Sequence, residues 1–99
     1  MVLADVNVLV SAHRSDAVHH AECRAWLEAV LRSDEAFGVS ESVLASVVRI
    51  ATHPKIFIPP STLDEALAFA GEVAGPEHAV RVAPGDRHWE IFTRLCRDA

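Results

Sequence analysis

The sequence has few basic residues and few cysteines, and it lacks a long apolar run. Nine Lys and Arg stand against 14 Asp and Glu, giving a formal net charge of −5, which excludes a broad cationic face that would hold nucleic acid through phosphates alone. The two cysteines, Cys23 and Cys96, form no C-x-x-C motif, which excludes a disulfide framework. No apolar run approaches the roughly 18 residues of a membrane span, and no secretory signal is seen. We expect a cytoplasmic protein without membrane association.

Several well-known catalytic motifs are also absent. The six histidines are scattered, without H-E-x-x-H or paired cysteine spacing, which argues against a zinc site. There is no G-x-S-x-G segment and no G-x-x-x-x-G-K-[ST] loop, which argues against a serine hydrolase and a P-loop nucleotide site. Any chemistry must therefore come from other side chains.

What the sequence does contain is typical of one packed domain. The chain has 99 residues, of which 51% are hydrophobic and 23% charged, so we expect a single domain over residues 1–99. Apolar runs at 1–4, 36–39 and 80–82 predict three strands, the first two of them buried. Apolar spacing and capping signals predict helices over 8–12, 17–32, 41–51 and 63–74, with Asn7, Ser40 and Thr62 as N-caps. A last helix is predicted after the N-cap Asp86, with Trp89, Phe92, Leu95 and Cys96 facing inward. This alternation predicts an α/β fold, a parallel sheet with right-handed crossovers and helices on both faces.

Asp5 is the first candidate functional residue. It follows the first predicted strand directly, and ligands of such sheets gather at the carboxyl ends of the strands. A carboxylate there needs a cation or hydrogen-bond donors. A hydrated Mg²⁺ would supply the first, whereas a turn in which the carboxylate binds backbone N–H groups would supply the second. The residues alone leave both interpretations open.

Four ordered segments resemble the PIN domains of VapC-type ribonuclease toxins from toxin–antitoxin pairs. They are D-V-N-V-L-V at 5–10, V-S-E-S-V-L at 39–44, R-I-A-T-H-P-K-I-F at 49–57 and P-G-D-R-H-W at 84–89. The resemblance covers essentially the whole chain. It implies a Rossmann-like PIN fold and an endoribonuclease in which carboxylates hold Mg²⁺ or Mn²⁺, and the metal activates water to cleave an RNA phosphodiester. It also implies a VapB-type antitoxin as partner, and a homodimer is common among such proteins.

The resemblance assigns site residues one at a time. Asp5 matches the first acid of the family and would be a catalytic metal ligand. The second acid falls on Glu41, which matches an S-E variant, because Ser46 occupies the position used by many relatives. Glu41 would equally be an ordinary first-turn carboxylate stabilised by the helix dipole. Apart from the resemblance, Arg14 is a candidate contact for an RNA phosphate because it follows the Asp5 segment, and an ordinary solvated arginine is the alternative interpretation.

The family's later acidic segments, G-N-x-x-x-D-A and T-x-D-x-D-F, are absent from these 99 residues. The chain has Asp98 near its last residue, but at a position before those segments. With two candidate carboxylates, we expect a C-terminally truncated PIN domain with weak or no nuclease activity. The alternative hypothesis is a catalytically dead fragment that only binds an antitoxin or another protein. A phosphoacceptor signalling domain fits poorly, because Asp5 has no acidic neighbour and Lys55 is its only candidate lysine.

Overall fold

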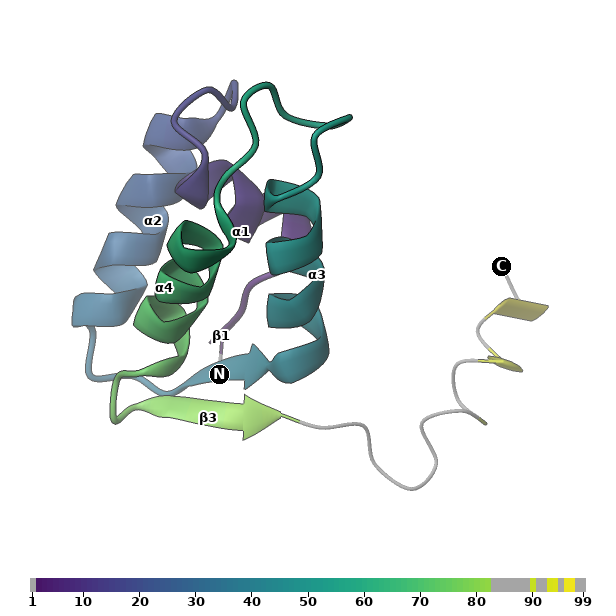
Figure 1. The fold of residues 1–99 in the computed structure, drawn as a ribbon. Coiled ribbons are helices and arrows are strands. Elements are labelled where there is room, and N and C mark those ends of the chain that lie inside the picture. Colours follow the sequence, from purple (N-terminus) through teal and green to yellow (C-terminus); the bar gives the residue numbers. More distant parts are fainter. Residues whose placement is uncertain (1, 83–89, 91–92, 95, 98–99) are drawn as a thin grey trace.

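The computed structural model describes residues 2–82, 90, 93–94 and 96–97 (Figure 1). Its elements are β1 (Val2–Leu3), α1 (Val6–His13), α2 (His20–Arg32), β2 (Phe37–Ser40), α3 (Glu41–Ala51), α4 (Leu63–Ala74) and β3 (Ala79–Val82). The predicted order of strands and helices is confirmed over these elements. The expected turn at 84–85, the N-cap Asp86 and most of the last expected helix lie outside the described residues, as does Asp98.

The three strands form a parallel sheet in which β2 lies between β1 and β3. Val2 pairs with Phe37, and Phe37 in turn pairs with Ala79. The predicted parallel α/β architecture is therefore confirmed. Because the strand order follows the chain order, two crossovers of the same hand carry their helices to the same side, and α1 to α4 lie together above the strands in Figure 1. The prediction that helices also cover the second face of the sheet is not tested by the described residues.

Local side-chain bonds fix where three helices begin. The Thr62 hydroxyl accepts from the Glu65 N–H at 3.1 Å while the Glu65 carboxylate accepts from the Thr62 N–H at 2.9 Å, which confirms the predicted capping box of α4. Ser40 caps α3 as predicted. The prediction for α1 is wrong, because Asp5 rather than Asn7 is the N-cap and the helix begins two residues earlier, at Val6. The Asp5 carboxylate accepts from the Val8 N–H, and only Ala4 and Asp5 separate β1 from α1.

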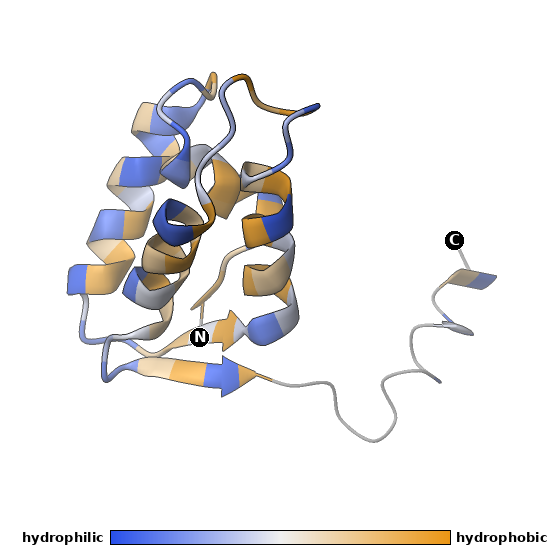
Figure 2. Ribbon diagram, in the orientation of Figure 1, coloured by the Kyte–Doolittle hydropathy of each residue, from blue (hydrophilic) through white to orange (hydrophobic). Residues whose placement is uncertain are grey.

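The hydrophobic core lies between the helices and the helix-facing side of β2. Leu9 and Leu27 from α1 and α2 meet Phe37 and Val39 of β2, and all four are at most 5% exposed. Val47 of α3 is fully buried beside them. Figure 2 shows α2 alternating between hydrophilic and hydrophobic residues along its length, as expected for a helix with one face on the core and one in solvent.

The first strand differs from its prediction. Val2 and Leu3 were expected to be buried, but they are 38% and 63% exposed. Their strand occupies one edge of the three described strands, so it contacts a neighbour on one side only. Apolar composition predicts a strand but does not predict its position in the sheet. Among the described residues, no helix is long and apolar enough to span a membrane.

Candidate functional site

Asp5 lies where β1 ends and α1 begins. Its Oδ1 accepts a hydrogen bond from the backbone N–H of Val8 at 2.9 Å, and the side chain is exposed. Of the two interpretations open to the sequence, the structure shows the helix cap. A cap uses one carboxylate oxygen in this geometry and leaves the residue at the carboxyl end of a strand, where it can still meet a cation from solvent. The metal-ligand role therefore stays a prediction.

Glu41 is the first residue of α3 and follows the last residue of β2. Its Oε1 lies 3.0 Å from Nη1 of Arg81, in an ion pair whose side chains are 79% and 59% exposed. Arg81 belongs to β3 and is the register partner of Val39. Sequence reasoning missed this partner, because the two residues are 40 positions apart and their contact depends on how β2 and β3 are paired.

The two predicted acids lie at the same edge of the sheet. β1 and β2 are parallel, with Leu3 opposite Gly38, and Asp5 and Glu41 each follow the carboxyl end of one of these two neighbouring strands. Carboxylate oxygens are the donors that Mg²⁺ and Mn²⁺ prefer, so the residue types fit such a metal. Over the part of the chain that the structure describes, no group of three or more His, Cys, Asp or Glu side chains is gathered as a metal site.

A surface hollow of about 340 Å³ adjoins Asp5. Its walls come from the end of β1 and from the facing sides of α1 and α2, with Glu22, Cys23 and Trp26 contributed by α2. The hollow is open and largely apolar, and the carboxylates of Asp5 and Glu22 line it. It gives Asp5 access to solvent.

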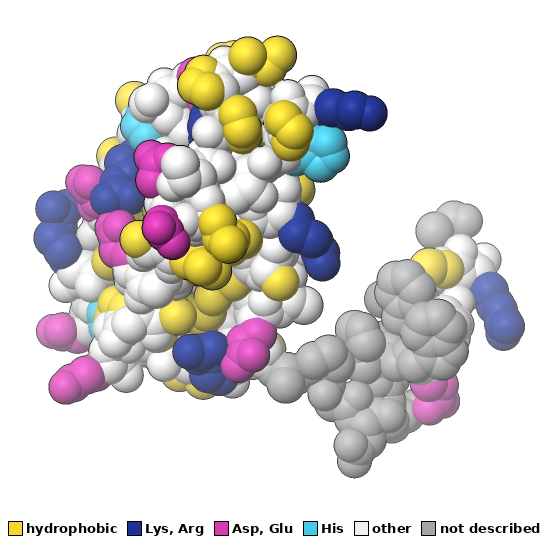
Figure 3. All heavy atoms as spheres, in the orientation of Figure 1, with side chains coloured by type: hydrophobic (Ala, Val, Ile, Leu, Met, Phe, Trp, Pro, Cys, Tyr) yellow, Lys and Arg dark blue, Asp and Glu magenta, His cyan; other side chains and the backbone are white. Residues whose placement is uncertain are grey.

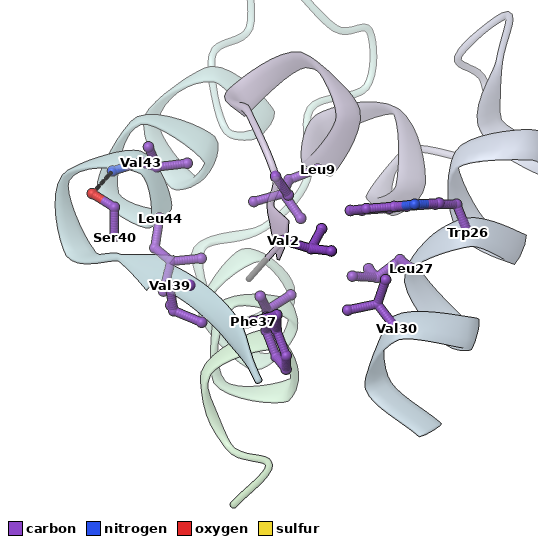
Figure 4. Close-up of a pocket in the computed structure, with 13 residues that line it drawn as sticks. Val2, Leu9, Trp26, Leu27, Val30, Phe37, Val39, Ser40, Val43 and Leu44 are labelled. Carbon is purple, nitrogen blue, oxygen red and sulfur yellow. Dashed lines mark hydrogen bonds between the residues drawn. The ribbon is translucent and has the colours of Figure 1, made fainter. Parts of the chain in front are cut away.

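A second gap, shown in Figure 4, lies in the core rather than at the surface. Trp26, Leu27 and Val30 of α2 face Phe37 and Val39 of β2 across it. Its volume is about 10 Å³, which admits no more than one water molecule. This gap is therefore part of core packing and not a ligand site.

Arg14, the predicted RNA contact, is held in a network within the protein. Its guanidinium lies 2.7 Å from Asp16, donates to the Pro59 carbonyl at 2.8 Å, and stacks over the Phe57 ring at 4.4 Å. Only 12% of the side chain is exposed. These contacts give Arg14 a structural role in holding the loop between α3 and α4. Binding to an RNA phosphate remains a prediction that this geometry disfavours.

His13 and Ser61 form a cluster that the sequence did not predict. His13 Nε2 lies 2.9 Å from Ser61 Oγ, and Arg14 donates to the same hydroxyl at 3.1 Å. Burial, followed by the neighbouring Arg14 charge, lowers the pKa of His13 below its usual value of 6.5. The adjoining hollow of about 460 Å³ is lined by this cluster and by Glu65. No motif signals such a cluster, because its members are 47 or 48 residues apart.

The charge distribution agrees with the net charge of −5. On the face drawn in Figure 3, acidic and basic side chains are interspersed over the helices, and the described residues form no broad basic patch there. Hydrophobic side chains also gather on this face. The exposed hydrophobic residues of the described chain include Leu63 and Leu67 of α4.

Comparison with known proteins decides the family. No protein-family model matches the chain, but curated relatives match it from end to end. The chain is 40% identical over 99 residues to Ribonuclease VapC31 of Mycobacterium tuberculosis, of which it covers 70%. It is 39% identical over 98 residues to VapC ribonuclease Mb2897 of Mycobacterium bovis, of which it covers 67%. The chain belongs to the VapC ribonuclease family.

Membership of the VapC family confirms the predicted resemblance, and the parallel sheet with its helices agrees with the PIN-like fold that the resemblance implies. Ribonuclease VapC25 of Mycobacterium tuberculosis is similar to the same extent, at 39% identity over 99 residues. The chain spans 67–70% of the length of these VapC relatives. For a member of this family, Asp5 and Glu41 are the two candidate metal ligands whose role an experiment has to test.

Proposed function

We propose that this VapC chain is the toxin of a toxin–antitoxin pair and acts as a metal-dependent endoribonuclease, with Asp5 and Glu41 as its acids. Its similarity to ribonucleases supports the reaction class. The observation that carries the assignment of residues is their placement, since both carboxylates follow the carboxyl ends of neighbouring parallel strands. That edge is where α/β sheets bind ligands.

In this proposal the two carboxylates hold Mg²⁺ or Mn²⁺ next to an RNA phosphate. The bound ion would activate water and neutralise charge that develops on the phosphate. Asp5 Oδ1 accepts a hydrogen bond from the Val8 N–H, which orients the carboxylate and leaves its second oxygen for the ion. Glu41 must turn toward Asp5, because its carboxylate is paired with Arg81.

A pair of substitutions at Asp5 separates metal binding from helix capping. Asp5→Asn keeps an oxygen that caps α1, since Asn and Asp are comparable N-caps, whereas Asp5→Ala loses about 1 kcal/mol of stability with the cap. Both variants remove the charge that a metal needs. We expect both to weaken Mn²⁺ binding, measured by the electron paramagnetic resonance of free Mn²⁺, and only Asp5→Ala to lower the melting temperature.

Cleavage of labelled RNA by the purified 99-residue chain tests the reaction itself. Because only two candidate carboxylates are available to hold the metal, we expect slow or no cleavage in Mg²⁺ or Mn²⁺. Any cleavage should disappear in the Asp5→Asn variant. If the Asp5→Asn and Glu41→Gln variants bind Mn²⁺ as tightly as the unchanged chain, the two residues are not metal ligands and the proposal loses them. Cleavage that persists in Asp5→Asn would contradict the assignment directly.

The second candidate function is binding without catalysis. It is favoured by the finding that the described residues gather no three-ligand metal group. The partner would be a VapB-type antitoxin, and a second copy of the chain is a further proposed partner. Isothermal titration of the 99-residue chain with the product of an adjacent antitoxin gene tests this. Complex formation with intact RNA in the cleavage assay supports binding alone, whereas absence of a complex contradicts it.

Two further predictions accompany the proposal. We take residues 1–99 as one PIN domain, in line with the continuous core that joins α1 to α4 with β2. We also propose a cytoplasmic location, in line with the free thiols of Cys23 and Cys96, since a reducing compartment keeps cysteines unpaired.

A further inference from the structure

The ion pair between Arg81 and Glu41 lies at the edge of the sheet that the proposed function uses. Arg81 is opposite Val39 in the parallel register, so both side chains leave the same face of the sheet. Val39 points into the core below the helices, and Arg81 therefore extends toward the first turn of α3. Its Nη1 reaches Glu41 Oε1 at 3.0 Å.

The ion pair turns the Glu41 carboxylate toward β3. The strand order β1-β2-β3 sets β3 on the side of β2 that is remote from β1. Asp5 follows β1, whereas Arg81 belongs to β3. Arg81 thus draws the Glu41 carboxylate away from the other predicted acid. A cation bound by Asp5 and Glu41 together needs the opposite orientation of Glu41.

We propose that Arg81 is a positioning residue that holds Glu41 on the β3 side of α3, and that a divalent cation must displace it to bind Glu41 and Asp5 together. This inference rests on the proposed function. Arg81 acts as an internal competitor for the carboxylate: it keeps Glu41 away from Asp5 until a doubly charged ion replaces the guanidinium.

The size of the effect follows from the exposure of the pair. Exposed ion pairs contribute at most about 1 kcal/mol, which corresponds to a change in binding constant of up to about fivefold. Removing the guanidinium should therefore tighten Mn²⁺ binding by about two- to fivefold. The change is modest but well within the precision of a Mn²⁺ titration.

The experiment is a Mn²⁺ titration of the 99-residue chain followed by electron paramagnetic resonance. The variants are Arg81→Gln, Glu41→Gln, the double variant, Asp5→Asn and Arg49→Gln. Arg49 is the matched control, because it is an exposed arginine further along α3 that bonds to Ser46 rather than to Glu41. Melting temperatures of all variants show that each remains folded.

We expect Arg81→Gln to bind Mn²⁺ more tightly than Arg49→Gln, and expect no gain from Arg81→Gln when Glu41 is already Gln. Equal affinities of Arg81→Gln and Arg49→Gln overturn the inference, as does a gain that persists without Glu41, since that would be a general effect of charge. Both results leave the proposed function intact if Asp5→Asn still weakens binding. Absence of Mn²⁺ binding in the unchanged chain contradicts the metal role and the inference with it.

Discussion

The imidazole of His13 and the hydroxyl of Ser61 are joined by a 2.9 Å hydrogen bond across 48 residues of sequence. Ser61 is only 8% exposed, and its oxygen also accepts from Arg14. Which of the two atoms, Ser61 Oγ or His13 Nε2, donates the shared proton depends on the tautomer of the imidazole. The contact ties the end of α1 to the loop that precedes α4.

Replacement of Ser61 should reveal how much this contact stabilises the fold. Ser61→Ala removes the hydroxyl that two partly buried groups, His13 Nε2 and Arg14 Nη1, bond to, so we expect a loss of about 1–3 kcal/mol in the free energy of unfolding. Ser15 is an exposed serine beside the same hollow, and Ser15→Ala should change stability by less than about 0.5 kcal/mol. Urea unfolding measures both. Equal effects at the two positions would contradict the role given to Ser61.

Stability should fall in mild acid because of His13. Burial, and then the Arg14 charge, lower its pKa in the folded chain, while Glu65 and Glu72 oppose and Arg24 adds to this shift. As the pH falls below 6.5, the unfolded chain takes up the proton first, so the contribution of neutral His13 is complete above that pH and decreases below it. The loss of stability between about pH 7.5 and about pH 5.5 should be smaller in His13→Gln. His19→Gln, at an exposed position, should behave like the unchanged chain.

Arg14 offers a direct test between structural support and RNA contact. Arg14→Gln loses the ion pair to Asp16 and the stacking on Phe57, so we expect about 1–3 kcal/mol less stability. At a temperature where the variant remains folded, its affinity for labelled RNA should equal that of the unchanged chain. A clear loss of RNA affinity with unchanged stability would instead assign Arg14 to the RNA surface.

The core prediction compares two leucines on helices. Leu27 of α2 is 1% exposed and Leu67 of α4 is 51% exposed. Leu27→Ala should reduce the free energy of unfolding by about 2–5 kcal/mol, because it removes buried apolar surface and leaves a cavity. Leu67→Ala should cost less than about 1 kcal/mol. Thermal or urea unfolding distinguishes the two, and similar losses would contradict the arrangement of the core.

Local features of the fold were predictable from the sequence. The Thr62–Glu65 capping box and the Ser40 cap involve residues three positions apart, so the pattern of residue types contains all that their formation requires. Asp5 shows the limit of such patterns. A carboxylate after a strand serves as a cap or as a ligand at the same position, and only the geometry shows that it binds the Val8 N–H.

Features that depend on distant pairing were not predictable. The exposure of Leu3 depends on the place of β1 in the sheet, and the partner of Glu41 depends on the register between β2 and β3. Arg14 was a candidate RNA contact because it follows the Asp5 segment. Its actual partners at 59 and 61 come from a loop more than 40 residues later.

The sheet register has a consequence for the order in which the chain folds. Val2 pairs with Phe37, and Phe37 pairs with Ala79, so each strand pairing closes a segment of several dozen residues. Closing long segments costs entropy before any pairing energy is gained. Contacts between α1 and α2, which are consecutive, carry a smaller cost. We therefore expect the helical layer to form first and the parallel sheet to close last, with the folding rate set by that final step.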